Sequence, residues 1–158
     1  MNSNISNDKQ ADLFNERIIA DIALKRTLLF RLNFWINICK YPVSHGNYYW
    51  NSSPEHRVIA MLSLAAYLKQ IPISLSDDNI DNQNYFTVTM VRSLTHVSER
   101  KIQRIIKFGI DRKDFILVKT KPYGYQATKQ LLSLYEVFEK TWIDSQKEEI
   151  KMWKKSNK

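Results

Sequence analysis

Residues 94–106 have the sequence LTHVSERKIQRII, which predicts a tight turn that leads into an amphipathic helix. Ser98 is a favourable N-cap for that helix, because its side-chain oxygen can accept a hydrogen bond from an unpaired N–H group of the first turn. Another helix is expected before the turn, over residues 86–94, although its β-branched residues also suit a strand. Apolar residues recur at the offsets that two short packed helices require: Val88, Val91, Leu94, Val97, Ile102, Ile105, Ile106 and Ile110. The stretch therefore predicts a helix, a turn and a helix that pack at a steep angle.

The residues that follow predict a glycine stop and a β-hairpin. Gly109 is expected to end a helix over residues 99–108, since glycine accepts the left-handed conformation that is common just after a helix C-terminus. Residues 115–121 are expected to form a strand, and residues 125–127 a short returning strand. Pro122-Tyr123-Gly124 would form the turn between the two strands.

Long helical patterns lie on both sides of this element. Residues 11–40 contain no proline or glycine and carry apolar residues three, four or six positions apart, and residues 129–155 show a similar pattern. Residues 1–10 are mostly polar and are expected to form a flexible N-terminus, followed by a single domain over residues 11–158. The predicted fold class is therefore mainly α-helical with a small β-hairpin.

Positive charge is concentrated on the central part of the chain. Residues 92–129 contain ten lysine or arginine residues and three acidic residues, a net charge of +7, whereas the whole chain has a net charge of +8. A basic surface that is confined to one structural element is typical of proteins that bind a polyanion. Double-stranded DNA is the simplest such partner for two helices joined by a turn.

The helix that begins after Ser98 is expected to leave its charged and amide side chains exposed. Its N-terminal residues would lie nearest the base edges if it entered the major groove of DNA. Arg100 and Arg104 are one helical turn apart and can each bond guanine O6 and N7, and Gln103 can bond adenine. We expect these three residues to read bases. The residues expected to contact phosphates are Thr95, His96, Ser98, Lys101, Lys107, Lys119, Lys121, Tyr123 and Lys129.

Other kinds of site are not expected. The chain has one cysteine, Cys39, and three histidines in different elements, so neither an intrachain disulfide nor a metal site is predicted. Its three glycines are too few for a phosphate-binding loop, and we expect no cofactor and no enzymatic activity. Residues 27–38, the most apolar stretch, are too short to span a bilayer. We therefore expect a cytoplasmic protein that is associated with the nucleoid and not with a membrane.

The succession of elements over residues 86–128 resembles a winged helix-turn-helix domain. With the flanking helices at residues 11–40 and 129–155, the layout resembles the MarR-type bacterial transcription regulators, most specifically over residues 94–106 and at Ala127-Thr128, where the last helix begins. The resemblance implies a homodimer in which the terminal helices of both subunits interleave. It also implies that the second helix of the central element is the recognition helix and that the hairpin is the wing. The implied function is sequence-specific binding of DNA as a transcription regulator.

Several alternatives stay open. A plasmid or phage replication or partition protein could use the same elements to bind repeated DNA sites, and a winged-helix protein could instead bind an acidic protein partner. The family's wing usually carries an Asp-x-Arg signature at its tip, where this chain has only Pro122-Tyr123-Gly124. A group of aromatic residues could line a pocket for an apolar small-molecule effector or could simply belong to the core. The members of this group are Phe34, Trp35, Tyr48, Tyr49 and Trp50.

Overall fold

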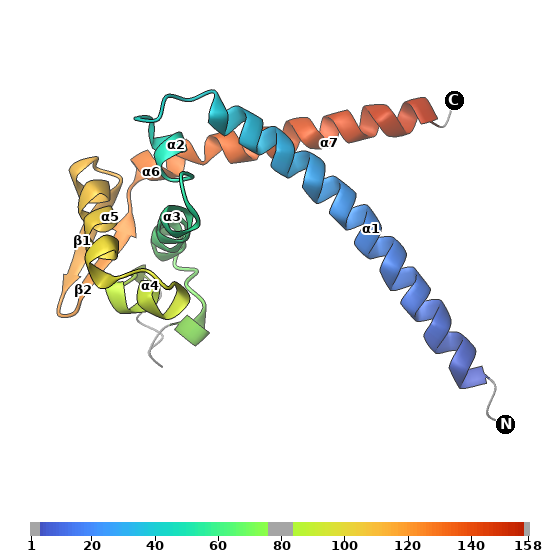
Figure 1. Ribbon diagram of the computed structural model, residues 1–158, viewed down its shortest axis with the longest axis horizontal. Helices are drawn as coiled ribbons and strands as arrows, with labels where there is room; N and C mark the ends of the chain where they lie inside the picture. Colours follow the sequence, from blue (N-terminus) through green and yellow to red (C-terminus); the bar gives the residue numbers. More distant parts are fainter. Residues whose placement is uncertain (1–3, 76–83, 157–158) are drawn as a thin grey trace. The chain divides into compact units, whose positions relative to one another are not determined.

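The computed structural model describes residues 4–75 and 84–156. The described chain is mainly helical and has a small antiparallel hairpin, which confirms the predicted fold class at this level (Figure 1). The elements in chain order are α1 (Asn4–Cys39), α2 (Gly46–Tyr49), α3 (Pro54–Tyr67), the short 3-10 helix η1 (Ile73–Leu75), α4 (Val88–Leu94), α5 (Glu99–Asp111), β1 (Phe115–Thr120), β2 (Tyr123–Ala127), α6 (Lys129–Leu134) and α7 (Glu136–Ser156).

The chain divides into two compact units. The central unit is Ile38–Glu136, and the helix-pair unit combines Met1–Asn37 with Val137–Lys158. This division differs from the single domain that we expected over residues 11–158. Within the described residues, no helix has the length and apolar character needed to cross a bilayer.

In the helix-pair unit, the C-terminal half of α1 packs against α7 (Figure 1). The Phe30 ring lies edge-on to the rings of Phe138 and Trp142, with centroid separations of 5.0 and 5.1 Å. Nδ2 of Asn37 donates a hydrogen bond to Oγ1 of Thr141 at 3.1 Å. These side chains belong to the flanking helices alone, which explains why the two helices form a unit of their own.

The central unit is built around α3, with α5 and the hairpin together on one side of it (Figure 1). Helix α3 packs against β2 and α6, α4 packs against α5, and α5 packs against β1. The buried apolar residues that form its core are Trp50, Ile59, Ala60, Leu62, Leu64, Ala66, Ile71, Phe86, Met90, Val91, Ile102, Ile105, Ile106, Phe115, Ala127 and Leu131. Every described element of this unit therefore contributes to one core or borders it, and η1 does so through Leu75.

Helices α4 and α5 pack through most of the apolar residues that the sequence predicts for this purpose. Val91 of α4 is buried together with three isoleucines of α5: Ile102, Ile105 and Ile106. Val88 and Val97 are half-buried against the same core. Leu94 and Ile110, by contrast, are 44% and 39% exposed, because each lies near the end of its helix, beyond the surface that the partner covers.

Strand β2 lies between β1 and a short extended segment at Phe86. The β1–β2 pairing runs from Phe115 opposite Ala127 to Thr120 opposite Tyr123. The backbone of Phe86 exchanges two hydrogen bonds with that of Tyr125, at 2.8 and 2.9 Å. The predicted helix over residues 86–94 is therefore shorter, since Phe86 pairs with the hairpin and α4 starts at Val88.

The hairpin turn differs from the predicted Pro122-Tyr123-Gly124, because Tyr123 and Gly124 belong to β2. Gly124 lies directly against the aromatic ring of Tyr85, where an added Cβ atom would come within 2.6 Å of ring carbon Cδ2. The glycine is thus required by the close approach of a ring and not by the turn. The chain reverses at Lys121-Pro122 instead.

We predicted that α5 would end before Gly109, but the helix continues to Asp111. Gly109 lies inside the helix and faces the Phe115 ring, which occupies the space that a Cβ atom would need. Lys113, two residues after the last helical residue, adopts the left-handed conformation with φ 65°. The N–H of Asp114 then donates to the carbonyl of Gly109 at 2.8 Å, a hydrogen bond typical of helix C-termini.

Replacing Gly109 by alanine is therefore expected to destabilise the protein by about 1–3 kcal/mol, the usual cost of overpacking a core. The added methyl group must displace the Phe115 ring, which is 1% exposed and has little room to move. Urea denaturation measures the change, with Arg100→Ala on the exposed face of the same helix as a control that shifts stability by less than about 0.5 kcal/mol. An unchanged urea midpoint for Gly109→Ala would contradict this packing.

The N-terminal helix is longer than expected. We predicted a flexible N-terminus over residues 1–10, but α1 begins at Asn4, so residues 4–10 are helical, and residues 1–3 lie outside the described range. Neither proline nor glycine occurs between Asn4 and Ala11 to interrupt the helix. The sequence is therefore compatible with a helix that begins at Asn4.

The C-terminal helix, predicted to be continuous over residues 129–155, is two helices that meet at Tyr135. Tyr135 packs against the core of the central unit, and burial raises the pKa of its hydroxyl to about 12. Thr128 precedes α6, but its side chain does not cap the helix and donates instead to the carbonyl of Lys113 at 2.7 Å. The break thus falls where the chain passes from the core of the central unit to α7.

Candidate nucleic-acid interface

The orientation of α5 is fixed by its cap and by its apolar face. The N–H of Lys101 donates to Oγ of Ser98 at 3.3 Å, which confirms Ser98 as the N-cap. On the other side of the turn, the hydroxyl of Thr95 donates to the carbonyl of Val91 at 2.9 Å. With Ile102, Ile105 and Ile106 buried in the core, α5 turns most of its other side chains outward.

The three residues predicted to read bases all lie on the exposed face of α5: Arg100, Gln103 and Arg104. Within the described residues, no ion pair or hydrogen bond restrains the Arg100 guanidinium. Arg104 lies close enough to Tyr49 and His56 to affect the pKa of both. The two arginines thus have at most weak attachments to the protein itself.

A small network joins the first turn of α5 to α4. A carboxylate oxygen of Glu99 lies 3.2 Å from Nη1 of Arg92, and the other accepts a hydrogen bond from Nε2 of Gln103 at 3.0 Å. All three side chains are exposed. The predicted adenine reader, Gln103, is therefore held by an acidic neighbour that was not among the predicted site residues.

The predicted phosphate contacts on the helices have different surroundings. Lys107 is exposed but pairs with Asp111 at 2.9 Å, and Lys101 is half-buried with Glu55 at 4.0 Å. His96 in the turn is exposed, whereas Thr95 is half-buried. The residue limits of α6 place Lys129 at its first position, where it is also exposed.

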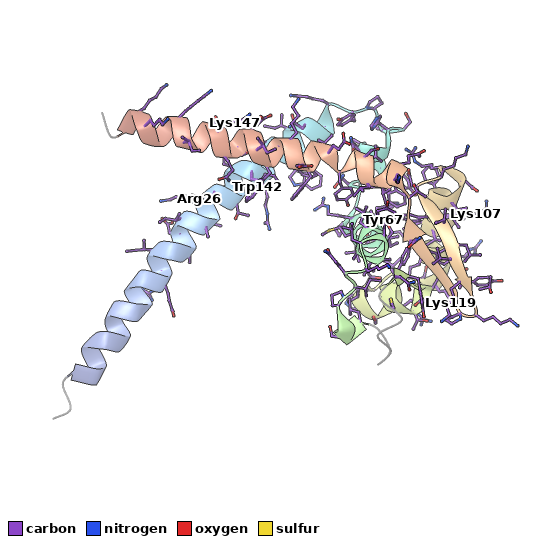
Figure 2. All side chains as sticks on the ribbon, turned by 180° about the vertical axis from the view of Figure 1, so that it is seen from behind. Arg26, Tyr67, Lys107, Lys119, Trp142 and Lys147 are labelled. Carbon is purple, nitrogen blue, oxygen red and sulfur yellow. The ribbon has the colours of Figure 1, made fainter. Side chains whose placement is uncertain are left out.

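The hairpin presents its lysines in two ways. Lys121 at the turn and Tyr123 at the start of β2 are both exposed. Lys119 is half-buried, since its ammonium group donates to the hydroxyl of Tyr85 at 2.9 Å and lies 4.7 Å from the centre of that ring. Lys107 on α5 and Lys119 on the hairpin both lie at the outer edge of the central unit, away from Tyr67 on α3 (Figure 2). Since α5 packs against β1, the cations of α5 and of the hairpin belong to the same compact unit.

The charge count over residues 92–129 includes Arg112 and Asp114, but these two residues form an ion pair in which the carboxylate is buried. Asp114 is fully buried and accepts hydrogen bonds from Nε of Arg112 at 2.9 Å, Nε1 of Trp50 at 2.8 Å and Nε2 of Gln130 at 2.8 Å. We call this set of four residues the Asp114 hub. It connects the residues after α2, the end of α5 and the start of α6, so it supports the base of the helix and hairpin that carry the exposed cations.

The N-terminus of α3 lies beside the cationic face of α5. His56 of α3 has a pKa below its usual value, first because it is partly buried and then because Lys101 and Arg104 are near, although Glu55 acts in the opposite direction. Burial raises the pKa of the Tyr49 hydroxyl, an effect that Arg104 and Arg112 oppose. The local positive potential from α5 thus reaches α2 and α3.

The lowered pKa of His56 predicts a loss of stability in mild acid. Above pH 6.5 the His56 imidazole is neutral in both the folded and the unfolded protein. Below pH 6.5 the imidazole of the unfolded chain becomes protonated, whereas that of the folded protein stays neutral until the pH reaches its lower pKa. The free energy of unfolding should therefore fall as the pH drops through this window. Urea midpoints at about pH 7.5 and 5.5, where carboxylates stay ionised, measure the loss, and His56→Gln should reduce it. An equal loss in both proteins would show that other groups are responsible.

The aromatic residues considered for an effector pocket divide between the two units. Phe34 packs against Phe30, Trp35 and Phe138 in the helix-pair unit. Trp50 is 1% exposed in the core of the central unit, where Tyr49 borders it. These contacts account for four of the five aromatic residues as packing: Phe34, Trp35, Tyr49 and Trp50.

No protein-family model matches this sequence, and comparison with curated proteins and with solved structures gave no significant match. Among the described residues, no three His, Cys, Asp or Glu side chains gather as a metal ion would require.

Proposed function

We propose that this protein is a homodimeric transcription regulator that binds specific sequences of double-stranded DNA through a winged helix-turn-helix element. In this proposal α4, the turn and α5 form the helix-turn-helix, and the β1–β2 hairpin is the wing. The observation that supports it most is the outward face of α5, where Arg100 and Arg104 stand exposed one helical turn apart. Two arginines in this arrangement match the spacing and chemistry of guanine edges in the major groove.

Phosphate contacts would hold α5 in the groove. The N–H groups at its capped start and the turn residue His96 suit the backbone on one side. Lys121 at the exposed hairpin turn would reach the neighbouring phosphates, while Lys119, fixed by Tyr85, would contribute charge from a set position. Lys107 would exchange its exposed pairing with Asp111 for a phosphate, a small loss because such surface pairs contribute little to stability.

The proposed homodimer would form through the helix-pair unit. Large apolar side chains on α1 and α7 are between 44% and 65% exposed: Ile18, Ile22, Leu24, Leu28, Leu32, Ile36, Phe138, Trp142, Ile143 and Ile150. Side chains of this size, half exposed, present roughly 100 Å² each, and so about 1,000 Å² together. A stable interface buries about 800 Å² from each partner, so a second copy of the chain fits this surface.

Replacing Leu28 by glutamate is expected to weaken the dimer roughly tenfold, because a charge would have to enter an apolar contact. Leu28 is 63% exposed, so the change should leave the fold of the monomer intact. Sedimentation equilibrium measures the dissociation constant. The control is Met61→Glu, the same replacement at an apolar residue of the central unit that is 56% exposed. Equal effects of both variants, or a monomeric wild-type protein, would contradict the proposed dimer.

Selection of bound duplexes from a random pool tests the proposed function. At about 50 mM salt, where release of counterions strongly favours association, the protein should retard duplex DNA in a gel, and retardation should weaken as salt rises. The selected sequences should show two-fold symmetry, as a dimer requires. Iterated sites without such symmetry would favour a replication or partition protein, and no retardation of any duplex would leave only the binding of an acidic protein partner.

A further inference from the structure

Glu99 occupies the first position of α5, where the proposed recognition helix would come nearest to the base edges. Its side chain is 52% exposed, and both carboxylate oxygens point to neighbours on the same surface, Arg92 at 3.2 Å and Gln103 at 3.0 Å. An acidic residue is unfavourable against a polyanion unless a donor on the DNA compensates for it. Its exposed place beside Arg92 and Arg100 is therefore favourable in a DNA complex only if a donor on the DNA replaces Arg92 as its partner.

We propose that Glu99 determines sequence specificity by accepting a hydrogen bond from the N4 amino group of a cytosine; this inference rests on the proposed DNA-binding function. Aspartate and glutamate accept hydrogen bonds from cytosine N4 in the major groove, where guanine offers O6 and N7 as acceptors and thymine offers O4. A carboxylate is repelled by such acceptors. Glu99 therefore favours cytosine at this position and disfavours guanine and thymine.

The bond to Gln103 gives this selection a fixed geometry. Gln103 lies one helical turn after Glu99, and its Nε2 donates a hydrogen bond to the Glu99 carboxylate at 3.0 Å. This bond holds the amide and the carboxylate in a fixed position relative to each other. Arg92 on α4 offsets the charge of Glu99 in the free protein and can turn to a phosphate when DNA is bound. The three residues together would read a short, defined part of each half-site.

The test compares Glu99→Gln with Asp111→Asn in the full chain. Both variants remove one negative charge from exposed positions of α5, but Asp111 lies at the other end of the helix and pairs with Lys107. Each variant is titrated with the duplex selected by the wild-type protein and with random duplex, and each is put through selection again. The ratio of the two affinities measures specificity, and thermal unfolding verifies that both variants are folded.

For Glu99→Gln, affinity for random duplex should rise while the specificity ratio falls at least about fivefold, the smallest usual cost of a mismatched base pair. The repeated selection should lose a cytosine from each half-site. Asp111→Asn should raise affinity for both duplexes alike and keep the selected sequence. A merely structural role of Glu99 would lower both affinities together.

Two outcomes separate failure of this inference from failure of the proposed function. If the wild-type protein binds DNA but Glu99→Gln keeps the same selected sequence and the same ratio, the role of Glu99 is refuted and DNA binding stands. If the wild-type protein retards no duplex at about 50 mM salt, the proposed function itself is refuted.

Discussion

Replacing Arg100 and Arg104 together by alanine is expected to remove most of the sequence-specific DNA binding and to leave the fold intact. Each guanidinium that bonds a guanine contributes about 1–3 kcal/mol of discrimination, so the double variant should bind its selected duplex at least about 30-fold more weakly. Affinity for random duplex should fall less, because phosphate contacts from the turn and hairpin remain. Both side chains are exposed, and stability should therefore change little.

Fluorescence anisotropy with the selected duplex and with random duplex measures both effects. The matched control is Lys147→Ala with Lys151→Ala, which removes the same charge from exposed positions of α7. An equal loss of affinity in the control would mean that overall charge, and not the face of α5, drives binding. Unchanged affinity in the arginine variant would refute the assignment of these two residues as base readers.

The elements around this face could be predicted because short-range chemistry determines them. Ser98 caps α5 in the structure as its side chain suggests, and Ile102, Ile105 and Ile106 of α5 are buried at the spacing that a helix requires. The two strands of the hairpin were predicted to within a few residues for the same reason. Caps and apolar periodicity involve residues within about one or two helical turns of each other, and a sequence pattern records them directly.

The glycines could not be interpreted correctly from sequence, because the residues that require them are not their neighbours. Gly109 leaves room for the ring of Phe115, which is six positions away in the sequence. Gly124 leaves room for the ring of Tyr85, which is thirty-nine positions away. A glycine after an apolar run usually indicates a helix stop or a turn, and the local pattern supplied that interpretation. Close approach of a ring depends on the tertiary packing.

The charges were only partly predictable for a similar reason. Counting residues places the excess of positive charge on the correct part of the chain, but it cannot tell which charges are paired. Arg112 pairs with the buried carboxylate of Asp114, and Lys119 donates a hydrogen bond to Tyr85. Glu99 is bonded to both Arg92 and Gln103. The exposed cations that remain on α5 and at the hairpin turn are fewer than the sequence count implies, and they define a smaller surface.

Replacing Asp114 by alanine is expected to destabilise the protein by about 2–5 kcal/mol, since it leaves buried donors without an acceptor. The largest part of this loss is expected at the indole N–H of Trp50, whose 2.8 Å hydrogen bond to Asp114 is removed. Trp50 is 1% exposed, so water cannot replace that hydrogen bond. Arg112 loses its carboxylate partner but keeps a hydrogen bond to the carbonyl of Ser44 at 3.1 Å. A loss of this size is a large part of the 5–15 kcal/mol that typical domains possess.

Urea denaturation measures this loss, and Asp111→Ala provides the control, because Asp111 is an exposed aspartate three positions earlier whose pairing with Lys107 should contribute less than about 1 kcal/mol. Asp114→Asn keeps the size of the side chain and one acceptor oxygen, so its loss should lie between the two. The Asp114 hub also fixes the end of α5 relative to the hairpin, so a folded Asp114→Asn protein should lose DNA affinity without losing any exposed cation. If Asp114→Ala were as stable as Asp111→Ala, the hub would not be the support of the cationic surface that its three hydrogen bonds indicate.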